Sequence, residues 1–269
     1  MSEKKLLWWH ELPATEVMRH AEEDCDIALL PIGAIEQHGP HCPAGSDALN
    51  AMGIAEKIAE KTGVMLLSCP MYGSHPYHHW GMPGTIPLRY ETHIAMLTDI
   101  VRGAAVAGYN KFIILSAHGQ VSSTIVAVHK LGLEGYFTLS LHWYDFLRDN
   151  RDVLDDYMWH ADEAETSVAL YLYPQYVDMS KAGEGGGEPL IDSKFIIAPG
   201  QTPEPGMMYH FEGTFARPEV EELANGIIGN AKGATLEKGE KLVTQVVDHV
   251  AEIIEDIRNR YPVGVSPLG

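Results

Sequence analysis

The 269-residue chain is poor in positive charge and has no long apolar stretch. It contains 19 Lys and Arg against 37 Asp and Glu, which gives a formal net charge of −18 at pH 7. Phosphate backbones and anionic lipid surfaces repel so acidic a protein, and we therefore expect neither nucleic acid nor membrane as a partner. No apolar run approaches the roughly 20 residues that a membrane-spanning helix needs.

Cysteine is also scarce, with only Cys25, Cys42 and Cys69. Their number is odd, and no two have Cys-x-x-Cys spacing. The first ten residues also lack the pattern of a signal peptide, and together these features predict a reducing, cytoplasmic location. Cys42 lies among potential metal ligands, but a small buried thiol is the commoner role for such a residue.

The order of the expected elements favours a mainly parallel sheet covered by helices. An apolar strand at 27–32 is followed by a helix at 48–61, which Thr62-Gly63 ends, and by a second strand at 64–68. Such a strand–helix–strand unit with short links is typical of an α/β fold. Neither a repeat nor a linker divides the chain, so we expect a single domain over 1–269. The remaining predicted elements are strands at 111–115 and 136–141 and helices at 89–108, 122–131 and 236–258.

Carboxylates and imidazoles gather in the loop after the first strand. Glu36, His38, His41 and Asp47 fall within twelve residues there. Open α/β sheets bind ligands at the carboxyl ends of their strands, which is where this loop begins. A mixed set of oxygen and imidazole ligands suits Zn, Mn or Fe better than Ca or Mg alone. The alternative is a surface loop with incidental histidines.

Further along the chain, His118 directly follows the strand at 111–115, in the same context as Glu36 and His38. This parallel favours the metal-site interpretation over the surface-loop one. Glu165 lies at the start of an apolar helix and needs a partner such as a metal ion or an arginine. His160 lies just before that helix, where it could act as a general acid or base; simple solvent exposure is the alternative.

In two segments the apolar residues have no regular helical or strand spacing. The first, 69–87, is dense in Gly, Pro, His and aromatic residues, and its His75, His78 and His79 either bind substrate or form a subunit contact. The second, 181–218, is too long for a tight connection and predicts a lid, an arm or an oligomer contact.

With these motifs in view, the chain resembles the creatininase (creatinine amidohydrolase) family nearly end to end. The family pattern Leu-Pro-x-Gly-x-x-Glu-Gln-His-Gly-x-His, followed by Gly-Thr-Asp, is similar to residues 30–41 and 45–47. Its Asn-Gly-His-Gly-Gly-Asn looks like residues 116–121, and its His-Ala-Gly-x-x-Glu-Thr-Ser looks like residues 160–167.

The resemblance implies a three-layer α/β/α sandwich with a mainly parallel central sheet and two divalent metal ions per chain, of Zn, Mn or Fe. If the family's ligands are assigned to the matching positions of this chain, Glu36 and His118 would ligate one ion. His38 and Glu165 would ligate the other, and Asp47 would bridge the two. His160 would be the acid/base or substrate-orienting residue. The family also implies a homo-oligomer, often a hexamer.

Departures from the family pattern put creatinine in doubt as the substrate. Creatininase places a Glu two residues after the metal histidine, where this chain has Gln120, which cannot act as a base. We expect a metal-dependent hydrolase of a small polar ring, with a lean toward an oxidised inositol such as 3-dehydro-scyllo-inosose. The alternatives are an amidohydrolase of creatinine-like lactams or formamides, and a non-enzymatic metal-binding partner protein. Substrate contacts are expected from His78, His79, Trp80, Gly119 and Trp143.

Overall fold

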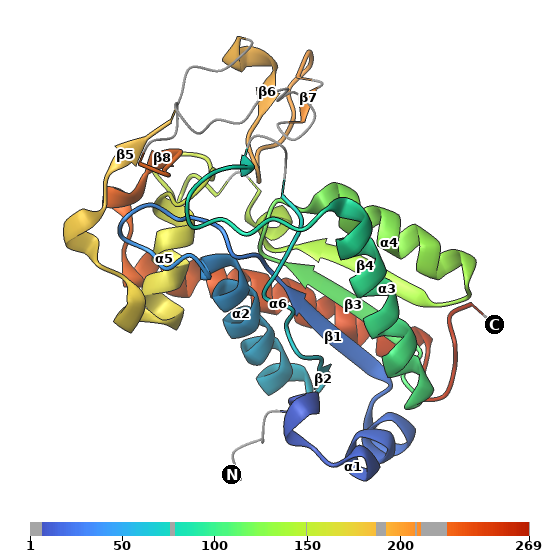
Figure 1. The fold of residues 1–269 in the computed structure, drawn as a ribbon. Helices are drawn as coiled ribbons and strands as arrows, with labels where there is room; N and C mark the ends of the chain where they lie inside the picture. The colour runs from blue at the N-terminus through green and yellow to red at the C-terminus, as the bar shows by residue number, and fades with distance from the viewer. Residues whose placement is uncertain are drawn as a thin grey trace.

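The fold is a parallel sheet enclosed between two layers of helices (Figure 1). The computed structural model describes residues 7–75, 79–148, 150–186, 192–207, 209–210 and 225–268. The four-stranded sheet has the order β2-β1-β3-β4, and all of its pairings are parallel. Its strands are β1 (Ile27–Ile32), β2 (Met65–Leu66), β3 (Lys111–Ser116) and β4 (Phe137–His142).

Alternate residues of the central strands enter two separate cores. Leu29 and Ile113 join one core with α2 (Ser46–Thr62), α5 (Glu163–Leu172) and α6 (Leu236–Arg260). Leu30 and Ile114 join the other with α3 (Tyr90–Val106) and α4 (Val121–Leu133). Strands covered on both faces read as continuous apolar runs, which is why β1 and β3 lack polar alternation. The predicted three-layer α/β/α fold is confirmed.

Smaller elements complete the described chain. Helix α1 (Ala14–Arg19) and a π turn at His20–Asp24 precede β1. Short 3-10 turns occur at Trp9–Glu11, Trp143–Leu147, Pro174–Tyr176, Met179–Lys181, Ser193–Phe195 and Ala231–Gly233. Two small sheets pair β5 (Glu184–Gly185) with β8 (Gly229–Asn230), and β6 (Ile196–Ile197) with β7 (Tyr209–His210), and they lie beyond the carboxyl ends of the main strands in Figure 1. Of the helices in the described residues, none has the length and apolar character to cross a membrane.

One boundary differs from the prediction in a way that matters for the site. The helix predicted at 48–61 begins two residues earlier, so Asp47 lies in the first turn of α2 rather than in the preceding loop. No side chain caps this helix, and Gly45 stands at the cap position. The partial positive charge of a helix amino terminus stabilises a carboxylate placed there.

Helix α6 packs closely on α5 because Gly239 has no side chain. A Cβ at this position would overlap the backbone oxygen of Ser167. We expect Gly239→Ala to lower the free energy of unfolding by about 1–3 kcal/mol, because the overpacking outweighs the better helix propensity of alanine. The matched control is Gly103→Ala on α3, where a Cβ meets nothing within 4 Å, and which should be stabilised by about 1 kcal/mol. Urea denaturation of both variants checks this, and equal effects of the two substitutions would contradict it.

Candidate metal centre

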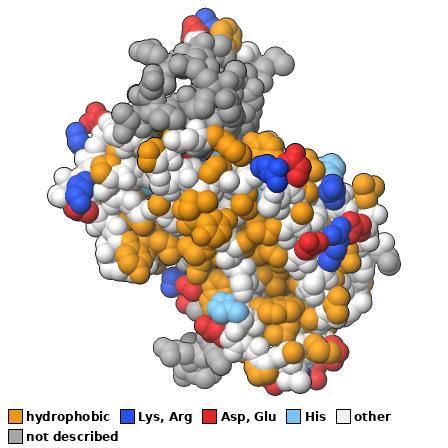
Figure 2. Space-filling model, viewed as in Figure 1, with side chains coloured by type: hydrophobic (Ala, Val, Ile, Leu, Met, Phe, Trp, Pro, Cys, Tyr) orange, Lys and Arg blue, Asp and Glu red, His pale blue; other side chains and the backbone are white. Residues whose placement is uncertain are grey.

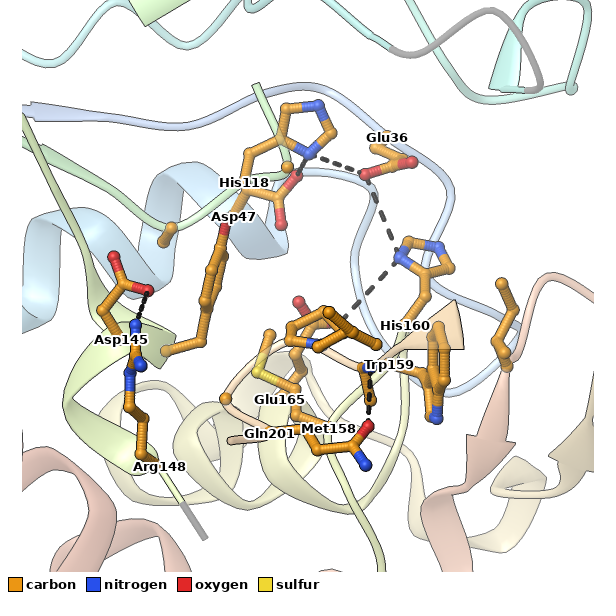
Figure 3. Close-up of a pocket in the computed structure, with 18 of the residues that line it drawn as sticks. Glu36, Asp47, His118, Asp145, Arg148, Met158, Trp159, His160, Glu165 and Gln201 are labelled. Atoms are coloured by element: carbon orange, nitrogen blue, oxygen red, sulfur yellow. Dashed lines mark hydrogen bonds and ion pairs between the residues drawn. The ribbon is translucent and has the colours of Figure 1, made fainter. Parts of the chain in front are cut away.

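The five predicted metal ligands lie together at the carboxyl ends of β1 and β3. Each is between 1% and 5% exposed. Figure 3 shows the carboxylates of Glu36 and Asp47 facing the ring of His118, with Glu165 and His160 across the pocket. The ligands come from four places in the chain: the loop after β1 (Glu36, His38), the first turn of α2 (Asp47), the loop after β3 (His118) and the first turn of α5 (Glu165).

Asp47 lies between two imidazoles. Its Oδ1 is 3.2 Å from Nε2 of His38, and its Oδ2 is 3.0 Å from Nδ1 of His118. Each imidazole has a second carboxylate nearby, because Oε2 of Glu165 is 3.5 Å from Nε2 of His38 and Oε2 of Glu36 is 3.0 Å from Nδ1 of His118. The cluster therefore has two halves that share one carboxylate.

Backbone carbonyls fix which nitrogen of each histidine is available. Nε2 of His118 lies 3.0 Å from the carbonyl oxygen of Ser74 and can donate its proton there. Nδ1 of His38 likewise lies 3.0 Å from the carbonyl oxygen of Glu36. In the neutral imidazoles, the nitrogens that face the carboxylates are then left as acceptors, which is how metal-binding histidines are usually held.

The cluster has the donor atoms that a divalent metal ion requires. Within the described part of the chain, Oε1 of Glu36, Nε2 of His38 and Oδ2 of Asp47 are buried and lack a hydrogen bond of ordinary geometry. Burial acts to raise the pKa of Glu36, but His79, His160 and His118 outweigh it and hold that pKa well below its usual value. Burial acts to lower the pKa of His38, but Asp47 and Glu165 raise it well above its usual value. Ionised carboxylates beside imidazoles that carry replaceable protons fit first-row divalent ions.

Glycine at the end of β1 allows Asp47 to approach the other ligands. A Cβ on Gly33 would overlap the backbone of Ala48, the residue after Asp47. Any side chain at this position would push the start of α2, and with it the shared carboxylate, away from the loop that carries Glu36. Gly33, the glycine of the Leu-Pro-x-Gly pattern, therefore leaves the space that Asp47 needs to lie close to Glu36.

His160 turns one nitrogen toward the cluster. Its Nε2 is 2.8 Å from the carbonyl oxygen of Gln37, while its Nδ1 is 4.0 Å from Oε2 of Glu36 and 3.9 Å from Oε2 of Glu165. The next residue, Ala161, has a φ of 50°, and its N–H donates to Glu165 Oε2 at 2.6 Å. A non-glycine residue with positive φ is uncommon and is often found at functional sites.

Asp162, which stands where the family pattern has Gly, caps the helix that carries Glu165. Its side chain accepts hydrogen bonds from the N–H groups of Ala164, Glu165 and Trp159. Burial and the charge of Glu165 raise the pKa of Asp162 to about 7. The substitution therefore adds a helix cap without adding a side chain to the pocket.

A pocket of about 250 Å³ opens onto the cluster. Its walls combine apolar and aromatic surface with a few polar groups, and both His79 and Gly119 line it as predicted. Much of one wall comes from residues 197–203, which the sequence marked only as a possible lid, arm or oligomer contact. Besides the ligands and those two residues, the lining includes Tyr144, Asp145, Arg148, Met158, Trp159, Ile197, Pro199 and Gln201.

Two predicted substrate contacts are not positioned as expected. Trp143 is fully buried in the core that contains α6, because the chain turns inward after β4, and it does not line the described part of the pocket. Trp80 does not line the described part of the pocket, and its Nε1 donates instead to the carbonyl oxygen of His75. His78 lies outside the described residues. His41 is buried beside the cluster, with Nε2 2.9 Å from Thr166 Oγ1.

Sequence and structure comparisons relate the chain to known proteins. Residues 10–254 match the family model of creatininase, described as creatinine amidohydrolase. The 3-dehydro-scyllo-inosose hydrolase of Thermotoga maritima is 31% identical over 265 residues, which cover 93% of this chain and 83% of that protein. The creatinine amidohydrolase of Pseudomonas putida is 28% identical over 272 residues, 93% of this chain and 95% of that one. A solved mutant creatininase of Zn-Zn type has 26% identity and a TM-score of 0.75, covering 96% of this chain and all of the other. The protein is thus a hydrolase that belongs to the creatininase family.

Proposed function

We propose that this hydrolase opens the ring of a small cyclic polyhydroxy ketone related to 3-dehydro-scyllo-inosose, at a centre of two divalent ions. The observation that carries the proposal is Asp47, whose two oxygens face His38 and His118 separately at the base of the pocket. The likeness to the Thermotoga hydrolase supports the substrate class. The ions are of the Zn, Mn or Fe type, because the donors are carboxylates and imidazoles.

When bound, the two ions supply a hydroxide nucleophile at neutral pH and polarise the carbonyl group under attack. Glu36 and His118 would hold one ion, His38 and Glu165 would hold the other, and Asp47 would be shared between them. Once water has added to the carbonyl carbon, the adjacent carbon–carbon bond of the ring breaks. The departing carbon keeps the electron pair of that bond and needs a proton. Nδ1 of His160 is placed to carry that proton, since its Nε2 is engaged by Gln37.

The size of the pocket favours a small cyclic substrate over a peptide. Its volume of about 250 Å³ lies below the range of roughly 300–1,000 Å³ that is usual for drug-sized ligands. Polar groups for hydroxyls come from His79, Asp145 and Gln201, and the apolar wall offers a face for the ring. Arg148 at the same wall is suited to the carboxylate that ring opening creates.

Gln120 argues against creatinine as the substrate. Its side chain donates to the carbonyl oxygen of Gly33 at 3.3 Å, and it does not line the described part of the pocket. Neither its chemistry nor its position allows it to act as a base. Hydrolysis of a lactam or formamide remains the second candidate, because the Pseudomonas relative is a creatinine amidohydrolase.

The substrate class is tested by measuring acid and amine release from the metal-loaded protein. We expect cyclic inosose-type ketones to yield one acid equivalent per turnover without an amine. His160→Asn should lower kcat by about 10²–10⁴-fold, the range for a lost general acid or base, and should retain its metal. Turnover of creatinine or a formamide with amine release, and none of the ketones, would move the assignment to the second candidate.

We further propose that the chain forms a single domain and a homo-oligomer, with a hexamer as the expected form. Residues 67–75 and 79–90 cross the face in view in Figure 1, and hydrophobic side chains gather in the middle of that face (Figure 2). Of these residues, Met71, Tyr72, Ile86 and Tyr90 are 40–50% exposed. Exposed apolar surface of this kind favours a subunit contact. Sedimentation of the wild type and of Tyr72→Asp checks the contact.

A cytoplasmic location is part of the same proposal. All three cysteines are free, and burial raises the pKa of Cys42 to about 11 and that of Cys69 to about 12. Buried thiols that stay protonated suit a reducing compartment.

A further inference from the structure

We propose that His75 is an additional ligand of the ion held by Glu36 and His118, so that the two ions have unlike donor sets. This inference rests on the proposed dinuclear centre and adds one residue to it. The sequence left His75 open between a substrate contact and a subunit contact, and the placement of its side chain fits neither of these.

The ring of His75 lies within reach of the Glu36–His118 half of the cluster. Its Nδ1 is 3.8 Å from Oε1 of Glu36, and the centroid of its ring is 4.4 Å from that of His118. One ligand atom from each of the three residues lies within 4.8 Å of the other two. Two atoms bound tetrahedrally to one ion at about 2.0–2.2 Å are about 3.3–3.6 Å apart, so Glu36 and His75 could share an ion after a shift of a few tenths of an ångström.

Within the described residues, the ring nitrogens of His75 have no hydrogen-bond partner. The residue is 1% exposed. Buried polar groups are nearly always paired, so an imidazole with two unpaired nitrogens needs an explanation. A cation between Nδ1 and the Glu36 carboxylate, whose Oε1 also contacts Nδ1 of His79 in this structure, supplies one.

Hydrogen bonds hold the backbone of Ser74 and His75 in place, and one of them comes from the proposed ligand His118. The Ser74 carbonyl accepts from Nε2 of His118, and the Ser74 hydroxyl lies 2.7 Å from that of Ser123. The carbonyl of His75 itself accepts from Nε1 of Trp80 at 3.2 Å. Because one of these bonds comes from His118, the positions of the two imidazoles are coupled, as is typical of ligands of a common ion.

The location of His75 argues against the two roles left open by the sequence. Among the described residues, those that line the substrate pocket include His79 and His160 but not His75. His75 borders a different hollow, with Trp80 and Arg89. A side chain so deeply buried offers no surface to a neighbouring subunit.

With His75 included, the two positions differ in chemistry. One would have two imidazoles, the Glu36 carboxylate and a share of Asp47, whereas among the described residues assigned as ligands the other would have one imidazole, His38, with Glu165 and its share of Asp47. Imidazole nitrogen favours Zn, Fe or Co, and carboxylate oxygen favours Mn. The two ions should therefore bind with different affinities, and the nitrogen-rich position should fill first with Co²⁺ or Zn²⁺.

The test is a Co²⁺ titration of the metal-free protein against a competing chromophoric chelator, with the visible absorption of bound Co²⁺ as a second readout. The wild type should bind two equivalents in two steps of different affinity. His75→Ala should weaken one step by at least about 100-fold, the upper end for loss of an outer-shell partner, and should change the visible spectrum. The other step should stay within about threefold.

The matched control is His20→Ala, which removes another buried histidine far from the centre. His20 is 4% exposed, and its ring nitrogens lie 3.0 Å from the Tyr109 hydroxyl and 3.1 Å from the Gly63 carbonyl, near the amino ends of the strands. It should leave both steps unchanged. A His75→Ala protein with both affinities and the spectrum of the wild type overturns the proposal, even if its KM rises. A wild type that binds no metal overturns the dinuclear centre itself.

Discussion

Asp47→Ala protein, purified without chelator or added metal, is expected to contain neither of the two ions. Asp47 is the only one of the five proposed ligands that faces both imidazoles, at 3.2 Å and 3.0 Å, so its removal weakens both positions at once. The carboxylate is also buried, and the amino terminus of α2 stabilises its negative charge. Elemental analysis should fall from about two equivalents to nearly none, and turnover should fall by more than the ~10–100-fold typical of outer-shell changes.

His38→Ala is the comparison for this variant, because it removes a ligand from one half of the cluster only. It should keep about one equivalent of metal. If Asp47→Ala retained two full equivalents, Asp47 would not bridge. If both variants lost both ions equally, the two positions would be cooperative rather than merely adjacent.

Lys111→Ala is expected to lower the free energy of unfolding by about 3–5 kcal/mol, because it leaves a buried carboxylate without its charge partner. The side chain of Lys111 is fully buried at the start of β3, and its Nζ lies 2.6 Å from Oδ2 of Asp26, which is 4% exposed. The same oxygen accepts from the N–H of Gly264 at 2.8 Å, so the ion pair also fastens the end of the chain that follows α6. Urea denaturation should show a lower midpoint with an unchanged slope.

Two further variants separate the buried charge from the loss of packing. Lys111→Met with Asp26→Leu removes both charges and should recover most of the loss, since an apolar pair of similar size avoids the desolvation cost. Arg102→Ala breaks an exposed ion pair with Glu134, 2.6 Å long, and should have a far smaller effect because solvent screens it. A double variant as unstable as Lys111→Ala would show that packing, not charge, dominates.

The sequence predicted those features that have a strong local signal. β1 and β3 were recognisable because strands buried on both faces are uniformly apolar, and the polar residues directly after them had to meet at one edge of a parallel sheet. The ligands Glu36, His38 and His118 could be found from this rule alone. Asp47 was predicted in the same loop as Glu36 and His38, whereas the pairing of Glu165 with them needed the family resemblance, because nothing local to α5 indicates which loop that helix faces.

The remaining features depend on tertiary contacts that a single sequence does not carry. Trp143 follows a strand end just as His118 does, yet the chain turns there into a 3-10 segment and the indole enters the core. The pocket wall at 197–203 has no periodicity to mark it, and its position depends on contacts with Tyr144 and Leu147, whose backbone oxygens lie next to Gly200. His75 looked like one of several loop histidines, and only the tertiary structure shows that His79 lines the pocket whereas His75 borders a different hollow.

The first turns of α2 and α5 both supply a proposed ligand, Asp47 and Glu165, and these two helices pack against each other over the sheet. Ions at the centre would therefore join the amino ends of two elements of the core, and binding would be thermodynamically linked to folding. A ligand that binds only the native state adds about 2.7 kcal/mol to its stability at a free concentration of 100 times its Kd. Scarcity of metal would then cost a cell more than turnover, because chains emptied of their ions would unfold more often and become substrates for proteolysis.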